Sequence, residues 1–263
     1  MSRRRFYAPP SAFNADRTSV HLQAEEARHL VDVLRLKPGD EAFVFDGEGR
    51  EYRCRVAAEE RDRHRSSTSG ASLEISEEVN PARPESALQL TLCVALLKGE
   101  KFDMVVQKTT ELGVWKIVPV VTKFADIRLK DSADGARRTE RWQRIALEAS
   151  KQSGRARVPL IEAPCDFNTL VETERADEES EHNIIFFSER EGRGFNEMIT
   201  QLTSMPLSLT AMIGPEGGWA DEELSQARLS GWTIITLGGR VLRAETAAIA
   251  VAALLQHRFG DLV

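Results

Sequence analysis

Two segments near the C-terminus decide the fold: MIGPEGGWADEEL, residues 212–224, and LGGRVLRAETAAIAVAALLQ, residues 237–256. Each predicts a strand that ends in a glycine-containing turn and then enters a helix. The carboxyl ends of sheet strands are where α/β proteins bind ligands, so two such turns indicate a nucleoside-like ligand. On these residues alone, the alternative that both turns are simple connections stays open.

Working back along the chain, the same alternation of strand and helix continues to residue 81 and predicts an α/β domain with a largely parallel sheet. The expected strands are residues 88–97, 114–121, 183–187, 208–213 and 233–237, and the expected helices include residues 99–113 and 139–153. Neither GxGxxG nor GxxxxGK follows the first strand, where Lys98-Gly99-Glu100-Lys101 stands. This disfavours the nucleotide-binding folds that use an early loop, so the late loops must form the site.

The chain before PARPES, residues 81–86, has a different pattern. Short alternating stretches are separated by turn signals, with a hairpin turn expected at residues 46–49 and one amphipathic helix at residues 24–36. This pattern predicts a small β-barrel. We therefore expect two domains, residues 1–80 and residues 81–263.

Composition narrows the class of protein. The chain has 263 residues, of which 41% are hydrophobic and 29% charged, and its longest apolar runs are too short to span a bilayer. No apolar segment follows MSRRR, and the three cysteines form no CxxC pair. We expect a cytoplasmic protein with no membrane partner. The histidines and cysteines have no metal-ligand spacing, so no metal is expected.

The net charge of −6 argues against indiscriminate binding of nucleic acid, but local basic clusters remain. Three arginines precede an aromatic pair at the N-terminus, which combines groups that pair with phosphate and rings that stack on bases. The candidate RNA-binding residues are Arg3, Arg4, Arg5, Phe6, Arg35, Lys98, Lys101, Lys108 and Arg155. A solvated surface explains each cluster about as well when it is judged alone.

Six motifs in order carry a resemblance over almost the whole chain. They are RRFY, HLVDVLRLKPGD, GEKFDMVVQKTTELGV, RWQRIALEASKQSGRARVP, IGPEGG and VLRAETAAIAVAALLQHRFGDL. With them the sequence resembles the RsmE family of SPOUT methyltransferases, which use S-adenosylmethionine to methylate N-3 of a uridine in 16S ribosomal RNA of the small subunit. The resemblance implies a PUA-like β-barrel, an α/β domain with a C-terminal trefoil knot, and a homodimer.

The resemblance also implies which residues hold the cofactor. These are Ser188, Glu189, Ile213, Gly214, Pro215, Glu216, Gly217, Gly218, Leu237, Gly238, Val241, Leu242 and Arg243. Three positions depart from the usual family pattern. Ala220 replaces a hydroxyl residue that could cap a helix, so we expect Asp221 to substitute as the cap. Gly239 is expected to loosen its turn, and Ala244 removes a possible hydroxyl contact.

The reaction itself suggests two catalytic candidates, Arg243 and Glu245. Uracil N-3 carries a proton, so a carboxylate could act as base or a cation could stabilise the developing negative charge. Structural roles for both residues stay open, as does the choice between naked RNA and an assembled subunit as substrate. Two other functions remain: a non-catalytic RNA-binding protein, and a SPOUT enzyme that methylates a ribose 2′-hydroxyl or transfer RNA.

Overall fold

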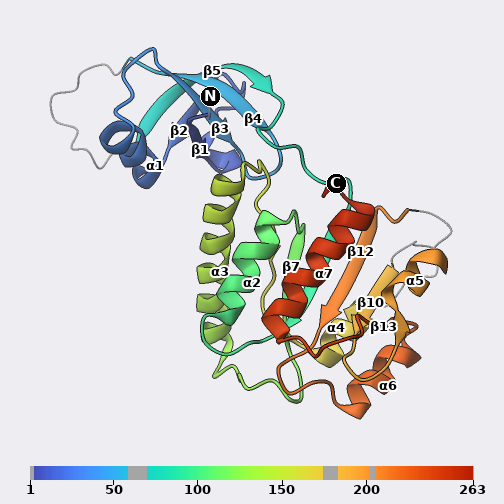
Figure 1. Ribbon diagram of the computed structural model, residues 1–263. Coiled ribbons are helices and arrows are strands. Elements are labelled where there is room, and N and C mark those ends of the chain that lie inside the picture. The colour runs from blue at the N-terminus through green and yellow to red at the C-terminus, as the bar shows by residue number, and fades with distance from the viewer. Residues whose placement is uncertain (1–2, 59–69, 174–182, 202–204, 263) are drawn as a thin grey trace. The chain divides into compact units, whose positions relative to one another are not determined.

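The structure is a computed structural model that describes residues 3–58, 70–173, 183–201 and 205–262. The chain forms two compact units, shown in Figure 1. The first comprises Met1–Glu85 and Ser150–Val158, and the second comprises Ser86–Ala149 and Pro159–Val263. The first unit is thus built from two separate stretches of chain. A single boundary after residue 80 leaves the second stretch, Ser150–Val158, out of the first unit.

The first unit contains one five-stranded sheet. Its elements are β1 (Arg5–Tyr7), η1 (Pro10–Ala12), β2 (Ser19–Leu22), α1 (Ala24–Arg28), η2 (His29–Val33), β3 (Glu41–Phe45), β4 (Glu51–Val56) and β5 (Ala71–Val79). The strand order is β1-β3-β4-β5-β2, with β1 parallel to β3 and the other pairs antiparallel. All five strands contribute to a single core, for example through Phe6, Leu22, Val44, Cys54 and Leu73. The five strands therefore share one core.

The second unit contains the expected parallel sheet. Its strands are β6 (Gln89–Ala95), β7 (Lys116–Val121), β8 (Leu160–Ile161), β9 (Cys165–Asp166), β10 (Asn183–Phe187), β11 (Arg193–Gly194), β12 (Ser208–Ile213) and β13 (Thr233–Thr236). They run in the order β11-β13-β10-β12-β6-β7-β8, and β9 also pairs with β7. Every pairing in this sheet is parallel. Neighbouring strands therefore present their carboxyl ends at the same edge.

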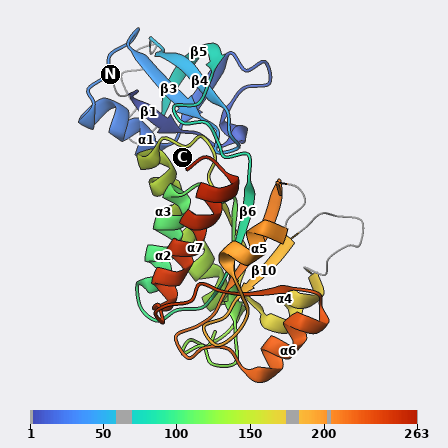
Figure 2. The same cartoon turned by 45° about the vertical axis from the view of Figure 1, so that its right-hand side comes forward.

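Helices cover both faces of this sheet, as Figures 1 and 2 show. They are α2 (Lys101–Glu111), α3 (Ser132–Ser153), α4 (Phe167–Thr173), α5 (Phe195–Gln201), α6 (Asp221–Leu229) and α7 (Ala244–Phe259). Side chains of α4 and α6 share a core with one face of the central strands. On the other face α7 packs against α2, β6 and β12. Burial on both faces explains why β6 and β12 are almost continuously apolar.

The last helix presents only some of its apolar residues to solvent. Val251 and Leu255 are fully buried within the chain, whereas Ile249 is half-buried and Leu254 is exposed. Only part of this helix therefore offers apolar surface to a partner.

Candidate active site

A cavity of about 490 Å³ lies at the carboxyl ends of the adjacent strands β10, β12 and β13. The loops after these three strands supply most of its wall, and the first turns of α7 supply the remainder. Its lining residues are Phe187, Ser188, Glu189, Ile213, Gly214, Pro215, Glu216, Gly217, Gly218, Thr236, Leu237, Gly238, Gly239, Arg240, Val241, Leu242, Arg243, Ala244, Ala247 and Val251. Every residue predicted to hold the cofactor is among them.

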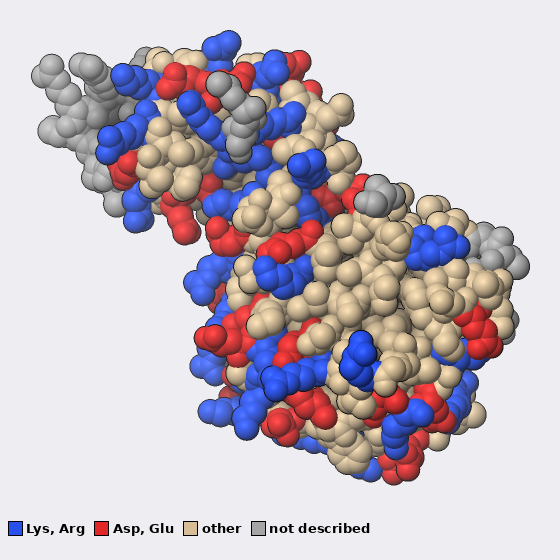
Figure 3. Space-filling model, viewed as in Figure 1, with Lys and Arg blue, Asp and Glu red and all other residues tan. Residues whose placement is uncertain are grey.

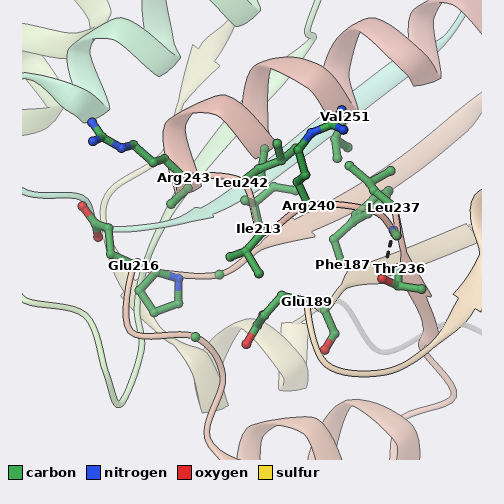
Figure 4. A pocket seen from close by; sticks show the side chains of 18 of the residues that line it. Phe187, Glu189, Ile213, Glu216, Thr236, Leu237, Arg240, Leu242, Arg243 and Val251 are labelled. Atoms are coloured by element: carbon green, nitrogen blue, oxygen red, sulfur yellow. Dashed lines mark hydrogen bonds between the residues drawn. The ribbon is translucent and has the colours of Figure 1, made fainter.

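Sequence reasoning missed seven of these lining residues. Phe187, Thr236, Gly239, Arg240 and Ala244 each adjoin a predicted residue, so a wider window around each turn contains them. Ala247 and Val251 lie one and two turns into α7 and could be found only from helical spacing. Figure 4 shows Ile213 and Leu242 near the centre of the cavity, with Arg243 and Glu216 together at one side.

Gly214 allows a tryptophan to pack beneath the loop after β12. A Cβ atom at this position would lie 2.8 Å from Cε2 of Trp219, closer than carbon atoms pack without a clash. The Trp219 ring is buried, and its Nε1 donates a hydrogen bond to the Phe187 carbonyl oxygen at 2.8 Å. Because Gly214 has no side chain, the Trp219 ring fits beside it. The hydrogen bond from that ring then connects the loop after β12 to the end of β10.

The next two glycines also make room for protein atoms. A Cβ atom on Gly217 would lie 2.9 Å from the Cβ and the carbonyl oxygen of Phe124. Gly218 has a φ of +72°, and its N–H donates to the Pro215 carbonyl oxygen at 3.0 Å to close the turn. This is the left-handed region, which glycine adopts without the steric cost of a side chain. These glycines fix the shape of the loop.

The turn after β13 has a different reason for its glycines. Gly238 and Gly239 have φ values of +69° and +71°, and nothing lies within 4 Å of a Cβ atom built on either. The Gly238 N–H donates to Oγ1 of Thr236 at 3.2 Å, the bond drawn in Figure 4. At this turn the left-handed backbone favours glycine, and the space beside both glycines is open. Gly239 therefore suits its left-handed backbone.

Helix α6 is capped by a residue other than the one predicted. Ala220 is the N-cap and has no side-chain acceptor, but its N–H donates to Oε2 of Glu223 at 3.0 Å. The other carboxylate oxygen of Glu223 accepts the Lys123 N–H at 2.8 Å. Asp221 pairs instead with Arg190 at 3.0 Å. The expectation that Asp221 substitutes as the cap is wrong, because Asp221 already lies inside the helix.

Charged side chains from three elements meet beside the cavity. Lys101 Nζ donates to Glu216 Oε1 at 2.8 Å and lies 3.8 Å from Glu245 Oε2. Burial raises the pKa of Glu216, but the hydrogen bond and charge of Lys101 together with backbone hydrogen bonds outweigh it, so this pKa is below its ordinary value. The same hydrogen bond raises the pKa of Lys101. Both groups are therefore charged at neutral pH.

The two catalytic candidates differ in their surroundings. Arg243 is exposed, lines the cavity and is the N-cap residue of α7. Glu245 is buried in the first turn of α7 and does not line the cavity, and its Oε2 has no hydrogen-bond partner. A buried acceptor without a donor is costly, so this oxygen is a poorly satisfied group close to the site.

The candidate RNA-binding residues divide into exposed and buried sets. Arg4, Arg35 and Lys98 are exposed. Lys101 is bound to Glu216 as described, and Lys108 donates to both carboxylate oxygens of Glu111, at 2.9 and 3.1 Å. Lys101 and Lys108 are half-buried and already paired with carboxylates, so among these lysines only Lys98 is fully open to phosphate.

Four other candidates serve the interior of the first unit. Phe6 is fully buried, and the Arg5 and Arg155 side chains are almost so. Arg5 donates to Oε2 of the fully buried Glu51 and to the Arg155 carbonyl oxygen, while Arg155 pairs with Glu85 at 2.7 Å. Arg3, half-buried, also donates to Glu51. The burial of Phe6, Arg5 and Arg155 corrects the expectation that these three face RNA, whereas Arg3 stays partly exposed.

The described part of the chain contains neither a candidate metal cluster nor a candidate membrane-spanning helix. Among residues 3–58, 70–173, 183–201 and 205–262, no group of three or more His, Cys, Asp or Glu side chains could hold a metal ion. No helix within these ranges is long and apolar enough to cross a membrane.

Fold and cavity define the class: an α/β protein that binds a small ligand where three parallel strands end. A family model described as an RNA methyltransferase domain matches residues 84–256, and one described as an RNA methyltransferase PUA domain matches residues 22–63. The chain belongs to this RNA methyltransferase family. The resemblance to the RsmE family is confirmed, as are the α/β fold and the PUA-like domain.

Individual relatives agree with this assignment. Ribosomal RNA small subunit methyltransferase E of Synechocystis is 32% identical over 94% of this chain and 75% of its own length. The protein of the same name from Bacillus subtilis is 27% identical over 90% of this chain and 89% of its own. Among solved structures, the Neisseria gonorrhoeae protein of that name, bound to S-adenosylmethionine, has a TM-score of 0.81 and 31% identity, with full coverage of both chains.

Proposed function

We propose that this protein uses S-adenosylmethionine to methylate N-3 of a uridine in 16S ribosomal RNA. One observation carries the proposal: a single cavity, formed mainly by the loops after β10, β12 and β13, is lined by every residue expected to bind the cofactor. Relatives that carry the name of a small-subunit ribosomal RNA methyltransferase support the substrate class.

The cavity fits a nucleoside-sized cofactor. Its volume of about 490 Å³ lies within the range usual for small-molecule sites. The open space at Gly238 and Gly239 lets a ligand approach the backbone closely, and Ile213 and Leu242 supply apolar contact. When bound there, S-adenosylmethionine supplies an activated methyl group. The protein must then hold the acceptor nitrogen in line with it.

The chain's own residues can assist removal of the N-3 proton. Arg243 is a cation at the rim of the cavity, where it can stabilise negative charge on the uracil carbonyl oxygens. Glu245 is a carboxylate with an unsatisfied oxygen, but Lys101 lies between it and Glu216. We therefore assign Arg243 to charge stabilisation, and we assign Glu245 to proton removal only if RNA binding opens a path to it.

Single-turnover methyl transfer separates these roles. Arg243→Ala should reduce the rate on bound RNA by on the order of a hundredfold, as loss of a charge-stabilising donor does. Arg258→Ala, at the far end of α7, is the matched control and should leave the rate unchanged. If Glu245 is the base, Glu245→Gln should slow the reaction without loss of stability. Nucleoside analysis that finds methyl on ribose or on carbon 5 would overturn the proposed reaction.

Cofactor binding can be tested apart from RNA. Gly238→Val forces a β-branched residue into left-handed backbone beside the cavity and should weaken S-adenosylmethionine binding measured by calorimetry. Gly231→Val imposes the same strain at a φ of +76°, also in open space, outside that cavity. Equal affinity in the two variants would remove the site assignment.

The remaining features are proposals of the same kind. We infer a cytoplasmic homodimer that acts on RNA of the small ribosomal subunit, with the chain between β13 and α7 forming part of a trefoil knot. The connection from β13, outside β10, back to α7 against β6 and β12 supports a crossing of this sort. The exposed Val241 and Leu254 support a partner on that side of the second unit.

A further inference from the structure

The turn that follows α1 has unusual geometry. Residues His29–Val33 form one turn of π-helix, in which the Leu34 N–H donates to the His29 carbonyl oxygen at 3.0 Å. Arg35 then adopts a φ of +52°, which is uncommon for any residue except glycine. Single π-turns and strained residues both occur preferentially at functional sites. A continuous α-helix over residues 24–36, as expected from the sequence, would have shown neither feature.

This geometry turns apolar side chains outward. Leu30 is fully buried and Leu36 nearly so, and together they fix the turn to the core of the first unit. Between them Val31, Val33 and Leu34 are 52%, 65% and 37% exposed. Three large apolar side chains are therefore exposed within a stretch of four residues, and we take them together as one apolar patch. Such patches, when bordered by polar groups, mark interaction sites.

Cations and one aromatic ring border the patch. Arg28, Arg35 and Lys37 are exposed, against one exposed carboxylate, Asp32. This local excess of positive charge contrasts with the net charge of −6 for the whole chain. Figure 3 shows uncharged surface over α1 with charged side chains around it. His29 is also exposed, and its ring lies edge-on to Phe6 with the ring centroids 5.8 Å apart.

We propose that residues 28–37 form a docking surface for an unstacked nucleotide of single-stranded ribosomal RNA. Val31, Val33 and Leu34 supply an apolar face for the base, and the His29 ring and the Arg35 guanidinium supply planes on which it stacks. Arg28 and Lys37 pair with the flanking phosphates. The positive border favours RNA over an apolar protein partner. The inference rests on the proposed function, since it names the contact by which the first unit holds that substrate.

The test measures binding of 16S ribosomal RNA transcribed in vitro, over a series of salt concentrations. Val31→Ser with Val33→Ser removes apolar surface without changing charge and should weaken binding at least about fivefold, the effect of losing one stacked base. The salt dependence should not change. Leu229→Ser, at a 90% exposed leucine of α6, is the matched control and should bind normally.

Two charge variants give independent readouts. Arg35→Gly relieves the left-handed strain, so a structural role predicts unchanged or better stability and normal RNA binding. The proposal predicts weaker binding, because the guanidinium plane on which the base stacks is lost. Asp32→Lys adds a cation to the same turn and should tighten binding, a gain that a folding defect cannot produce.

The outcomes distinguish this surface from the proposed reaction. Calorimetry should find the same S-adenosylmethionine affinity in every variant, because the cavity lies in the second unit. If the unaltered protein binds no cofactor, the proposed reaction fails, and the RNA titrations still judge the surface. Wild-type RNA affinity in both the serine and glycine variants would overturn the docking surface. So would a change of oligomeric mass in the serine variant with RNA affinity unchanged.

Discussion

At the scale of single residues, the glycines of the cavity meet two different physical needs. Gly214 and Gly217 lack a side chain because protein atoms of Trp219 and Phe124 occupy that space. Gly238 and Gly239 have open space but left-handed backbone. Substitution at the first pair is therefore a packing problem, and substitution at the second pair is a problem of backbone conformation.

Gly214→Ala should lower the free energy of unfolding of the second unit by about 1–3 kcal/mol, the usual cost of overpacking. The added methyl group would displace the Trp219 ring and weaken its hydrogen bond to Phe187. Urea denaturation followed by tryptophan fluorescence measures this. Gly194→Ala is the control, since Gly194 has open space and no left-handed backbone. Equal stability of the two variants would contradict the packing argument.

The cavity could be predicted from the sequence to the extent that it is local. Gly214 and Gly238 stand in short strand-turn-helix patterns, and parallel strands bring such turns to one edge. Arg5 and Arg155 could not be interpreted this way, because the contact between them joins residues 150 positions apart. An arginine in a basic run looks exposed in sequence, and only the fold shows that Glu51 neutralises it.

At the scale of elements, polar residues at a helix end can extend the helix beyond the part that the periodic pattern of apolar residues predicts. Helix α3 begins at Ser132, seven residues before the expected start at Thr139, since its charged first turns carry no apolar stripe. Strands β10 and β12 have the expected bounds, because apolar runs and flanking polar residues mark both ends. The π-turn His29–Val33 was unpredictable, because its hydrogen bond joins residues five apart where an α-helix joins residues four apart, a difference that leaves no clear mark in the sequence.

Helix α4 offers a test of one such end. Asp166 precedes it and accepts the Thr169 N–H at 2.9 Å and the Thr169 hydroxyl at 3.0 Å. Asp166→Ala should lower the free energy of unfolding by about 1 kcal/mol at neutral pH, the usual value of an N-cap. Asp166→Asn keeps an acceptor and should lose much less. Urea midpoints of the three proteins measure the difference.

The stability that the Asp166 cap contributes depends on pH. The backbone and side-chain hydrogen bonds from Thr169 hold the pKa of Asp166 below its ordinary value of 3.8. A carboxyl group whose pKa is lower in the folded protein stabilises the fold fully at a pH above its ordinary pKa. This stabilisation is lost as the pH falls through the lower pKa of the folded state. The difference in the free energy of unfolding between wild type and Asp166→Asn should therefore shift in favour of the asparagine variant only below pH 3.8. A shift at neutral pH would show that another group is responsible.

At the scale of the whole molecule, the second unit leaves apolar surface beside its cavity. Val241 is 82% exposed in the loop before α7, and Leu254 and Met104 are also exposed. Figure 3 shows a broad face over α7 and β12 with few charged side chains. Val251 and Leu255 pack inward and add nothing to this surface, whereas Leu254 on the same helix contributes to it. An exposed apolar face of this kind favours association with a second copy.

Sedimentation should give a mass twice the chain's 29.4 kDa at micromolar concentration. Val241→Glu places a charge on the expected interface and should shift the protein toward monomer, because burial of an unpaired carboxylate is costly. Leu229→Glu, on an even more exposed leucine in α6, should leave the mass unchanged. A monomer in the unaltered protein would contradict the homodimer.

The two-segment construction of the first unit has a consequence during synthesis on the ribosome. Residues Ser150–Val158 supply the partners of Arg5 and Glu85, yet they are translated some 70 residues after the rest of that unit. At translation rates of about 5–20 residues per second, the nascent sheet waits roughly 4–15 s for its final segment. During that interval Glu85 has no Arg155 to bind, and the N-terminal unit cannot reach its final structure until all of α3 and the residues to Val158 have been made.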